Sequence, residues 1–156
     1  MPNPRSNSAQ PQGCTNLQLR QLMRRVAQHY DAELGKAGLK TTQYSLLTVV
    51  DRLGPMQPGA LARSLGLQAS TLTRNLKPLV AAGLLHLGPG PDGRSRLVEI
   101  TAAGRARRAE AKRAWKTAQL ELNRILGPQR VVALHGLIQE SLALLAAPAQ
   151  EDAEAA

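Results

Sequence analysis

Apolar side chains recur at helical spacing along most of the chain. The first stripe has an apolar residue every three or four positions, the period of an amphipathic helix: Leu19, Leu22, Met23, Val26, Tyr30 and Leu34. Thr15 and Gln18 have the spacing of a capping box, which satisfies free amides at a helix start. Cys14 is placed to form a hydrophobic staple with Leu19. We therefore predict a helix from about Thr15 to the segment between Gly35 and Gly38.

Two shorter helices are predicted next. One covers residues 41–53, where Gly54 and Pro55 end it. The other opens at Pro58, whose fixed backbone angle suits a first helical turn, and ends at Gly66, which can adopt the left-handed conformation of a tight turn. The apolar residues expected inside are Leu46, Leu47, Val49, Val50, Leu53, Leu61, Ala62 and Leu65.

A fourth helix is predicted over residues 69–82, with Gly83 as its C-terminal cap. Pro78 lies inside this helix and leaves the carbonyl of Arg74 without its amide partner. We therefore expect a kink that costs about 3 kcal/mol. Its buried side would consist of Leu72, Leu76, Leu79 and Val80.

A β-hairpin and a long helix follow. Two short apolar runs, 84–87 and 96–100, flank a tip rich in glycine and proline at residues 88–94. Thr101 has a side chain suited to an N-cap, and the helical pattern then continues to Leu126, before a Gly-Pro pair. At 1.5 Å per residue this helix would be about 37 Å long.

The length of 156 residues accommodates one domain with a core of ordinary size. A last helix over 129–145 has further apolar residues available for burial: Val132, Leu134, Leu137, Ile138, Leu142 and Leu145. The ends, 1–14 and 146–156, are poor in large apolar residues, which predicts flexible tails. We expect a mainly α fold with a small β-hairpin, in a single domain over residues 15–145.

Composition and motifs narrow the class of protein. The chain is 43% hydrophobic and 20% charged, as is typical of globular domains. It has neither a membrane-length apolar stretch nor a secretory signal, which favours the cytoplasm. Cys14 is the only cysteine, so an internal disulfide is excluded. Without a P-loop, a dinucleotide fingerprint or an HExxH motif, and with scattered histidines at 29, 86 and 135, we predict neither an enzyme nor a metal or cofactor site.

Basic side chains are concentrated in the middle of the chain. Residues 57–116 have 11 basic and 3 acidic side chains, whereas residues 117–156 have 2 and 5, within a net charge of +9. Such an excess is typical of nucleic-acid-binding domains. A sequence-indifferent DNA-coating protein is one alternative, because it needs only positive charge and a fold. A membrane-surface helix is another, although alanine dominates opposite its polar side of Arg105, Arg107, Arg108, Lys112, Arg113 and Lys116.

The order helix, short helix, glycine turn, helix and basic-tipped hairpin is that of a winged helix-turn-helix. In such a fold the second helix of the pair lies in the major groove of DNA, where its exposed side chains reach bases and phosphates. The side chains expected to do so are Gln68, Ser70, Thr71, Thr73, Arg74 and Lys77. The alternative is that Ser70 and Thr71 only cap the helix and that Arg74 is a solvated surface residue.

The hairpin tip adds a second set of contacts. Arginine is favoured in narrow minor grooves, and a loop rich in glycine and proline can approach the DNA backbone closely. We therefore place Arg94 and Arg96 at the DNA, with Asp92 orienting Arg94 through a bidentate pair.

Residues 92–104 read DGRSRLVEITAAG. This run is similar to the Asp-x-Arg wing and the Leu/Ile-Thr-x-x-Gly helix start of the MarR-type winged helix-turn-helix regulators of bacteria. Further similarity lies in TQYSLL at 42–47, Leu61-Ala62, TLTRNL at 71–76 and GLL at 83–85, and the resemblance spans about residues 17–145.

The resemblance implies a homodimer that sets two recognition helices on a pseudo-palindromic operator in double-stranded DNA, usually as a repressor. Helices at about 15–36 and 102–145 would hold the dimer, and residues 41–101 would form the DNA-binding lobe. The Leu, Val and Ile content of the terminal helices independently favours pairing with a second copy.

The family commonly releases DNA when a small anionic or phenolic ligand binds between the dimer helices and the lobe, or when a cysteine is oxidised. Cys14 precedes a helix start, where the dipole favours thiolate. Tyr30 and Tyr44 have spacings similar to those of the family's organic-hydroperoxide sensors, but Cys14 lies slightly before the sensing cysteine and Thr41 replaces a second tyrosine. The alternatives are that Cys14 packs as a small hydrophobe and that Trp115 packs in the core or lines a ligand cavity.

Overall fold

The computed structural model of the chain describes residues 11–146, which are mostly helical with one small hairpin. The predicted fold class is confirmed. The predicted tails lie mainly outside the described residues, at 1–10 and 147–156, and Ala146 belongs to the last helix rather than to a tail. In chain order the elements are α1 (Thr15–Leu34), the 3-10 turn η1 (Gly35–Ala37), α2 (Thr41–Leu53), α3 (Pro58–Leu65), α4 (Ala69–Ala81), β1 (Leu85–Pro89), β2 (Arg96–Ile100), α5 (Ala102–Leu126) and α6 (Pro128–Ala146).

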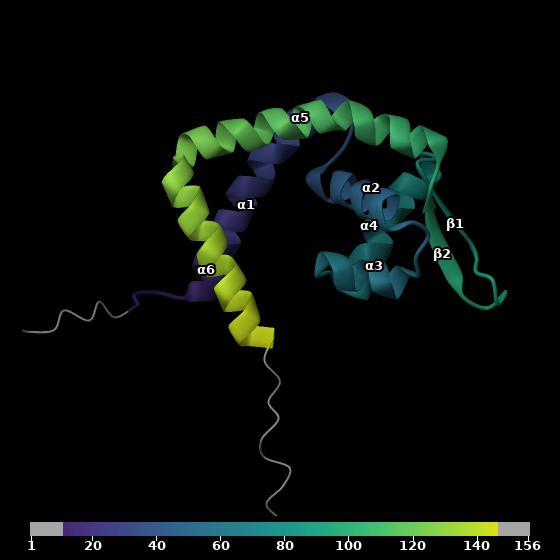
Figure 1. Cartoon of the computed structure of the whole chain (residues 1–156), viewed down its shortest axis with the longest axis horizontal. Coiled ribbons are helices and arrows are strands. Elements are labelled where there is room, and N and C mark those ends of the chain that lie inside the picture. Colours follow the sequence, from purple (N-terminus) through teal and green to yellow (C-terminus); the bar gives the residue numbers. More distant parts are fainter. Residues whose placement is uncertain (1–10, 147–156) are drawn as a thin grey trace, which may run out of the picture.

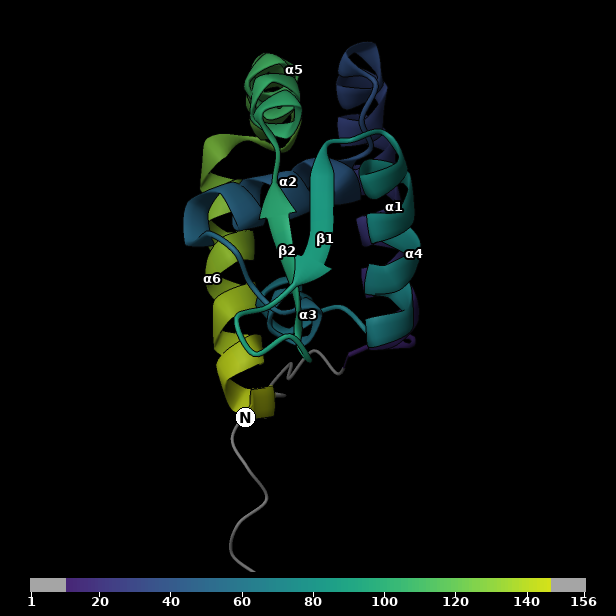
Figure 2. The same cartoon turned by 90° about the vertical axis from the view of Figure 1, so that its right-hand side faces the viewer.

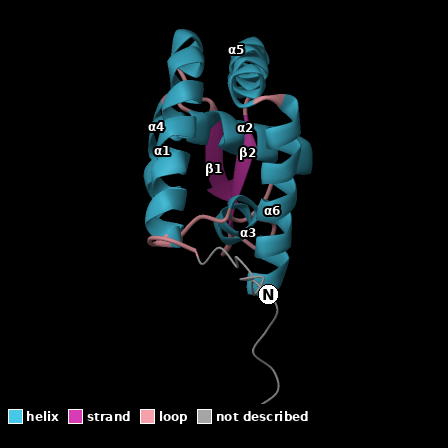
Figure 3. Ribbon diagram, turned by 90° about the vertical axis from the view of Figure 1, so that its left-hand side faces the viewer, coloured by secondary structure: helices cyan, strands magenta, loops and turns pink. Residues whose placement is uncertain are grey.

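The long helix α5 joins two parts of the molecule (Figure 1). Helices α2, α3 and α4 and the hairpin form a lobe at its N-terminal end, whereas α1 and α6 descend from its other half. Viewed from the side of α1 and α6, these two helices stand apart with the strands behind them (Figure 3). The hairpin is therefore on the opposite side of the molecule from α6.

Leucine and valine side chains from both parts make the core. In the hairpin, Leu85 pairs with Ile100 and Leu87 with Val98 in antiparallel register. Two residues that we expected in the core are exposed, Leu53 by 58% and Val80 by 36%. Both lie in the last turn of their helix, where the apolar face continues but no neighbouring element covers it. The fully buried side chains are Leu34, Leu46, Leu47, Leu61, Leu72, Leu79, Leu85, Val50 and Val98.

The turns after α3 and α4 depend on glycine. Gly66 and Gly83 have φ angles of 62° and 68°, in the left-handed region that favours glycine. After α4, the amides of Gly83 and Leu84 donate to the carbonyls of Val80 and Leu79 at 3.0 and 2.9 Å, the pattern of a Schellman motif. The predicted glycine stops are thus confirmed, and the one after α4 leads directly into the hairpin.

The start of α1 differs from the prediction. Cys14 rather than Thr15 is the N-cap, and no side chain caps the helix. Because a staple needs the position before the cap, Cys14 is not placed to form one with Leu19, which is 51% exposed. Gln18 instead donates from Nε2 to the carbonyl of Gln12 at 3.1 Å.

The junction between the hairpin and α5 is closely packed. Thr101 caps α5 as predicted: its Oγ1 accepts from the amide of Gly104 at 3.0 Å and donates to the carbonyl of Gly83 at 2.6 Å. A Cβ atom on Gly104 would overlap the carbonyl oxygen of Leu84. Glycine at this position therefore lets α5 touch the backbone that links α4 to β1.

Basic side chains at the start of α5 hold the lobe to this helix. Arg105 Nε and Arg108 Nη2 pair with the carboxylate of Asp51 in α2 at 3.2 and 2.7 Å. Arg107 Nη1 donates to the carbonyl of Ala37 at 3.4 Å. Three of the six basic side chains considered for a membrane surface, those of Arg105, Arg107 and Arg108, thus contact other elements of the protein. No helix within residues 11–146 is long and apolar enough to cross a membrane.

Candidate nucleic-acid interface

The first turn of α4 is open to solvent. Gln68 is the N-cap, and no side chain bonds to the free amides of this helix start. Gln68, Ser70 and Thr73 are exposed and Thr71 is half-buried. The capping role considered for Ser70 and Thr71 is wrong, because both lie inside the first turn. The free amides and these polar side chains form a surface suited to phosphate oxygens.

The two basic side chains of α4 extend this surface. Arg74 and Lys77 lie one turn apart and are exposed. Within the described residues, neither side chain forms an ion pair. The helix continues without interruption through Pro78 to Ala81, so all of these side chains share one rigid element. Thr73 is less available, because its Oγ1 donates to the carbonyl of Ala69 at 3.0 Å.

Asp92 holds the hairpin tip rather than the side chain of Arg94. Its Oδ1 accepts from the amides of Arg94 and Ser95 at 3.0 and 2.8 Å and from the Ser95 hydroxyl at 2.6 Å. The predicted bidentate pair between Asp92 and Arg94 is therefore wrong: backbone amides two and three residues away are closer than a long guanidinium. The Arg94 side chain is exposed and makes no ion pair within the described residues.

Acidification is expected to loosen the hairpin tip. The pKa of Asp92 lies below its ordinary value of 3.8, because the Ser95 hydroxyl and then the amides of Ser95 and Arg94 donate to the carboxylate. A carboxyl group with a depressed folded pKa contributes order above its unfolded pKa and loses it as the pH falls through the folded value. The amide chemical shifts of Arg94 and Ser95 should therefore move during an acid titration. In Asp92→Asn, whose oxygen still accepts but cannot titrate, they should stay constant; wild-type shifts that do not move would contradict the prediction.

The hairpin tip and the first turn of α4 lie at the same end of the lobe, away from α5 (Figure 2). Between residues 57 and 96 the sequence has five Arg or Lys side chains, and Asp92 is the only acidic one. Arg96 lies along the hairpin, where its Nη2 donates to the carbonyl of Leu87 at 3.3 Å. The structure thus brings the predicted residues of α4 and of the hairpin to one end of the lobe, with little negative charge among them.

The three residues considered for sensing are not brought together within one chain. Cys14 is exposed at the start of α1, whereas Tyr30 and Tyr44 are buried in the core. Along α1, Cys14 and Tyr30 are separated by about 24 Å at the helical rise of 1.5 Å per residue. Tyr44 stacks on Trp115 of α5, with ring centroids 6.2 Å apart.

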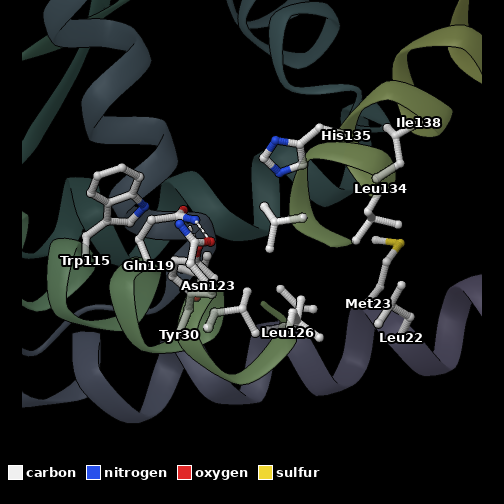
Figure 4. Close-up of a pocket in the computed structure, with 15 residues that line it drawn as sticks. Leu22, Met23, Tyr30, Trp115, Gln119, Asn123, Leu126, Leu134, His135 and Ile138 are labelled. Atoms are coloured by element: carbon white, nitrogen blue, oxygen red, sulfur yellow. Dashed lines mark hydrogen bonds between the residues drawn. The ribbon is translucent and has the colours of Figure 1, made fainter. Parts of the chain in front are cut away.

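A cavity of about 420 Å³ lies between α1, α5 and α6 (Figure 4). Tyr30 donates its hydroxyl hydrogen to Gln119 Oε1, and Gln119 Nε2 donates to Asn123 Oδ1 at 2.9 Å. Trp115 both stacks on Tyr44 and lines the cavity, so it combines the two alternatives considered for it. Gln119 and Asn123 were not predicted, although Gln119 follows Trp115 by four residues and Asn123 follows Gln119 by four, a spacing that places all three on one face of α5.

Three comparisons with known proteins agree on one class. The model of the MarR family matches residues 37–95. The uncharacterized HTH-type transcriptional regulator YwoH of Bacillus subtilis is 32% identical over 84 residues, which are 54% of this chain. This chain covers 61% of the length of that relative.

Two solved structures extend the likeness to most of the chain. The M. tuberculosis transcriptional regulator MosR, in complex with DNA, is 34% identical with a TM-score of 0.71; the match covers 85% of this chain and 98% of that one. A mutant MarR from E. coli, complexed with operator DNA, is 22% identical with a TM-score of 0.74, covering 81% and 92%. The second likeness concerns the fold alone.

Proposed function

This chain belongs to the MarR family of transcriptional regulators, and on that basis we propose that it binds a pseudo-palindromic operator as a homodimeric repressor. Its role is regulation of transcription rather than catalysis. The observation that carries the proposal is the surface at one end of the lobe, where Arg74, Lys77 and Arg94 are exposed without a described acidic partner.

Each side chain of this surface has a distinct role in the proposal. The start of α4 enters the major groove, where Gln68, Ser70, Thr71 and Arg74 reach base edges or phosphates and Lys77 contacts a phosphate. The hairpin enters the adjacent minor groove with Arg94, and Arg96 contacts the backbone. Asp92 acts through the backbone of the tip, which it holds in shape. The known DNA complex of the relative MosR supports duplex DNA as the partner.

Exposed apolar side chains on α1, α5 and α6 support the homodimer. α6 has a single buried residue, Val131, and apart from the half-buried Leu134 its other large apolar side chains are exposed in one chain. Contiguous apolar surface of this kind marks a protein interface, and a two-fold protein matches a two-fold operator. The exposed side chains are Leu17, Leu19, Leu22, Met23, Leu120, Ile125, Val132, Leu137, Ile138, Leu142, Leu144 and Leu145.

Release from DNA has two candidate triggers, a small ligand and oxidation of Cys14. The exposed position of Cys14 gives an oxidant access. The geometry of one chain favours the ligand, because the cavity is lined by residues of α1, α5 and α6 and by Thr41 of the lobe. Cys14, in contrast, lies at the end of α1 that is far from Tyr30 and Tyr44.

Selection from a random pool of duplexes tests the proposal. A homodimer with two recognition helices should enrich an inverted repeat whose half-sites are about one helical turn apart. Recovery of no consensus sequence, with tight binding at low salt, would instead support a sequence-indifferent DNA-coating protein.

Replacing Arg74 or Arg94 with alanine should impair DNA binding in different ways. Arg74→Ala should weaken binding to the selected operator by about 1–3 kcal/mol and relax base preference at one position per half-site. Arg94→Ala should weaken binding most where the flanking minor groove is narrow. Fluorescence anisotropy on operator variants measures both effects, with Arg113→Ala, an exposed arginine of α5, as the matched control. Unchanged affinity and selectivity in both variants would contradict the placement.

A further inference from the structure

Asp51, in the last turn of α2, joins the DNA-binding lobe to the long helix α5. Its Oδ1 accepts a hydrogen bond from Arg105 Nε at 3.2 Å, and its Oδ2 lies 2.7 Å from Arg108 Nη2. We propose that Asp51 is a positioning residue, which fixes the angle between the lobe and α5 and thereby sets the spacing of half-sites that the dimer accepts. This role rests on the proposed homodimer and its inverted repeat, and it names the residue that determines their spacing.

The ion pairs of Asp51 differ from the other ion pairs of the protein. Within residues 11–146, every other pair joins residues three positions apart, as Lys36 and Glu33 do. Pairs of that kind lie on the surface of one continuous segment and cannot orient one element against another. Both pairs of Asp51 instead connect α2 with α5, across 54 residues of chain in the case of Arg105.

The pair with Arg108 is largely shielded from water. The exposed fractions of the two side chains are 18% for Asp51 and 26% for Arg108. Arg108 Nε is buried and makes no hydrogen bond to the described residues, so the guanidinium depends on Asp51 for its partner. Shielded ion pairs add little net stability, because desolvation offsets their attraction, but they favour one arrangement over others. We therefore expect Asp51 to determine the orientation of the lobe more than its stability.

A second contact holds the other end of α2. Thr41, its first residue, donates from the amide and the hydroxyl to Asp31 Oδ1 of α1 at 2.7 and 2.6 Å. α2 is thus attached to α1 at its start and to α5 near its end, and two attachment points fix the direction of a rigid helix. Loss of the Asp51 contact leaves α2 free to pivot about Thr41, within the limits of the apolar packing around it.

The rest of the lobe is tied to α2. Just after this helix, Met56 and Val98 of β2 exchange two backbone hydrogen bonds at 3.2 and 2.8 Å, so the hairpin is attached at the end of α2 where Asp51 lies. α2 lies between α5 and α3 (Figure 2), and its Leu46 belongs to the same core as Leu72 of α4. A turn of α2 therefore moves both α4 and the hairpin relative to α5.

The spacing of the half-sites reports the orientation of the two lobes. Each base pair added between half-sites moves one of them by about 3.4 Å and turns it by about 35°. The wild-type dimer should therefore bind one spacing about tenfold or more tightly than spacings one base pair shorter or longer. In Asp51→Asn, which keeps the size of the side chain but loses its charge, this ratio should fall to about threefold or less. A role in stability alone would weaken binding to all spacings equally, and an unchanged ratio overturns the proposal.

Three further variants test the cause of this change. Asp51→Glu keeps the charge and should retain a larger ratio than Asp51→Asn; equal ratios in the two would show that charge pairing is not the cause. Glu110→Gln is the matched control, because it breaks an exposed ion pair within α5, and it should keep the wild-type ratio. If Asp51→Asn does not fold, Arg105→Gln removes one of the two pairs from a side chain that is 60% exposed. It should lower the ratio in the same direction, and a wild-type ratio there overturns the proposal.

The distance between the two lobes, measured without DNA, separates this role from the proposed function. Cys14 is the only cysteine, so in a Cys14→Ser background Ser64→Cys, at an exposed position of α3, gives one spin-labelled site per chain. Pulsed electron paramagnetic resonance should show one narrow distance distribution when Asp51 is present and a broader or displaced one in Asp51→Asn. A dimer whose distribution does not change overturns the role of Asp51 and leaves the proposed function intact. A protein that sediments as a monomer overturns both.

Discussion

Replacing Gly104 with alanine should destabilise the protein by about 3 kcal/mol, at the upper end of ordinary overpacking costs. The added Cβ would overlap the carbonyl oxygen of Leu84 and press on the Ile100 side chain. A backbone oxygen between α4 and β1 cannot rotate away as a side chain would. Since Thr101 caps α5 at the same junction, we expect the hairpin to shift relative to α4 and operator binding to weaken as well.

Urea unfolding, followed by circular dichroism, measures this cost. The matched control is Gly59→Ala, because a Cβ there meets only the flexible end of Arg63 at 3.7 Å. That variant should be more stable than the wild type by about 0.5 kcal/mol, since alanine loses less entropy in a helix. Equal stability of Gly104→Ala and the wild type would show that α5 does not contact the lobe as closely as described.

The second large effect concerns the apolar face of α6. The double substitution Leu142→Glu and Leu145→Glu should convert the dimer to a monomer, because the two side chains are 62% and 84% exposed in one chain and would be buried by a partner. Operator affinity should then fall at least a hundredfold, because the second recognition helix is no longer held at a high effective concentration.

Sedimentation equilibrium at micromolar concentration distinguishes the two states. Leu53→Glu is the control, since Leu53 is 58% exposed but lies on α2, outside the proposed interface. We expect the control to sediment as a dimer. A wild-type protein that sediments as a monomer, or a double variant that remains dimeric, would contradict the assignment of α6 to the interface.

Much of the fold could be predicted because glycine, proline and apolar spacing act locally. Gly66 and Gly83 end their helices through bonds to carbonyls within the preceding turns, so neighbouring residues determine the result. The prediction that Leu53 and Val80 are buried was wrong, because helical periodicity does not show where the covering element ends. The prediction that Thr15 caps the first helix was wrong, because the helix begins at Thr15 itself and Cys14 takes the N-cap position.

The candidate site also has parts that could be predicted from the sequence and parts that could not. Exposed basic residues on α4 and the hairpin follow from the order of the elements, so the sequence was enough to nominate Arg74 and Arg94. The role of Asp92 was not predictable, because a charge pair and an amide contact have the same sequence signature. The cavity depends on the angles between α1, α5 and α6, and Gln119 and Asn123 acquire a role only once those helices are placed.

The most direct test of the central claim is fluorescence anisotropy of the protein with duplex DNA from the region upstream of its own gene, against a scrambled duplex, across salt concentrations. We predict a preference for the native duplex of about a thousandfold or more at physiological salt. Equal and steeply salt-dependent binding to both duplexes would contradict a sequence-specific regulator acting at that site.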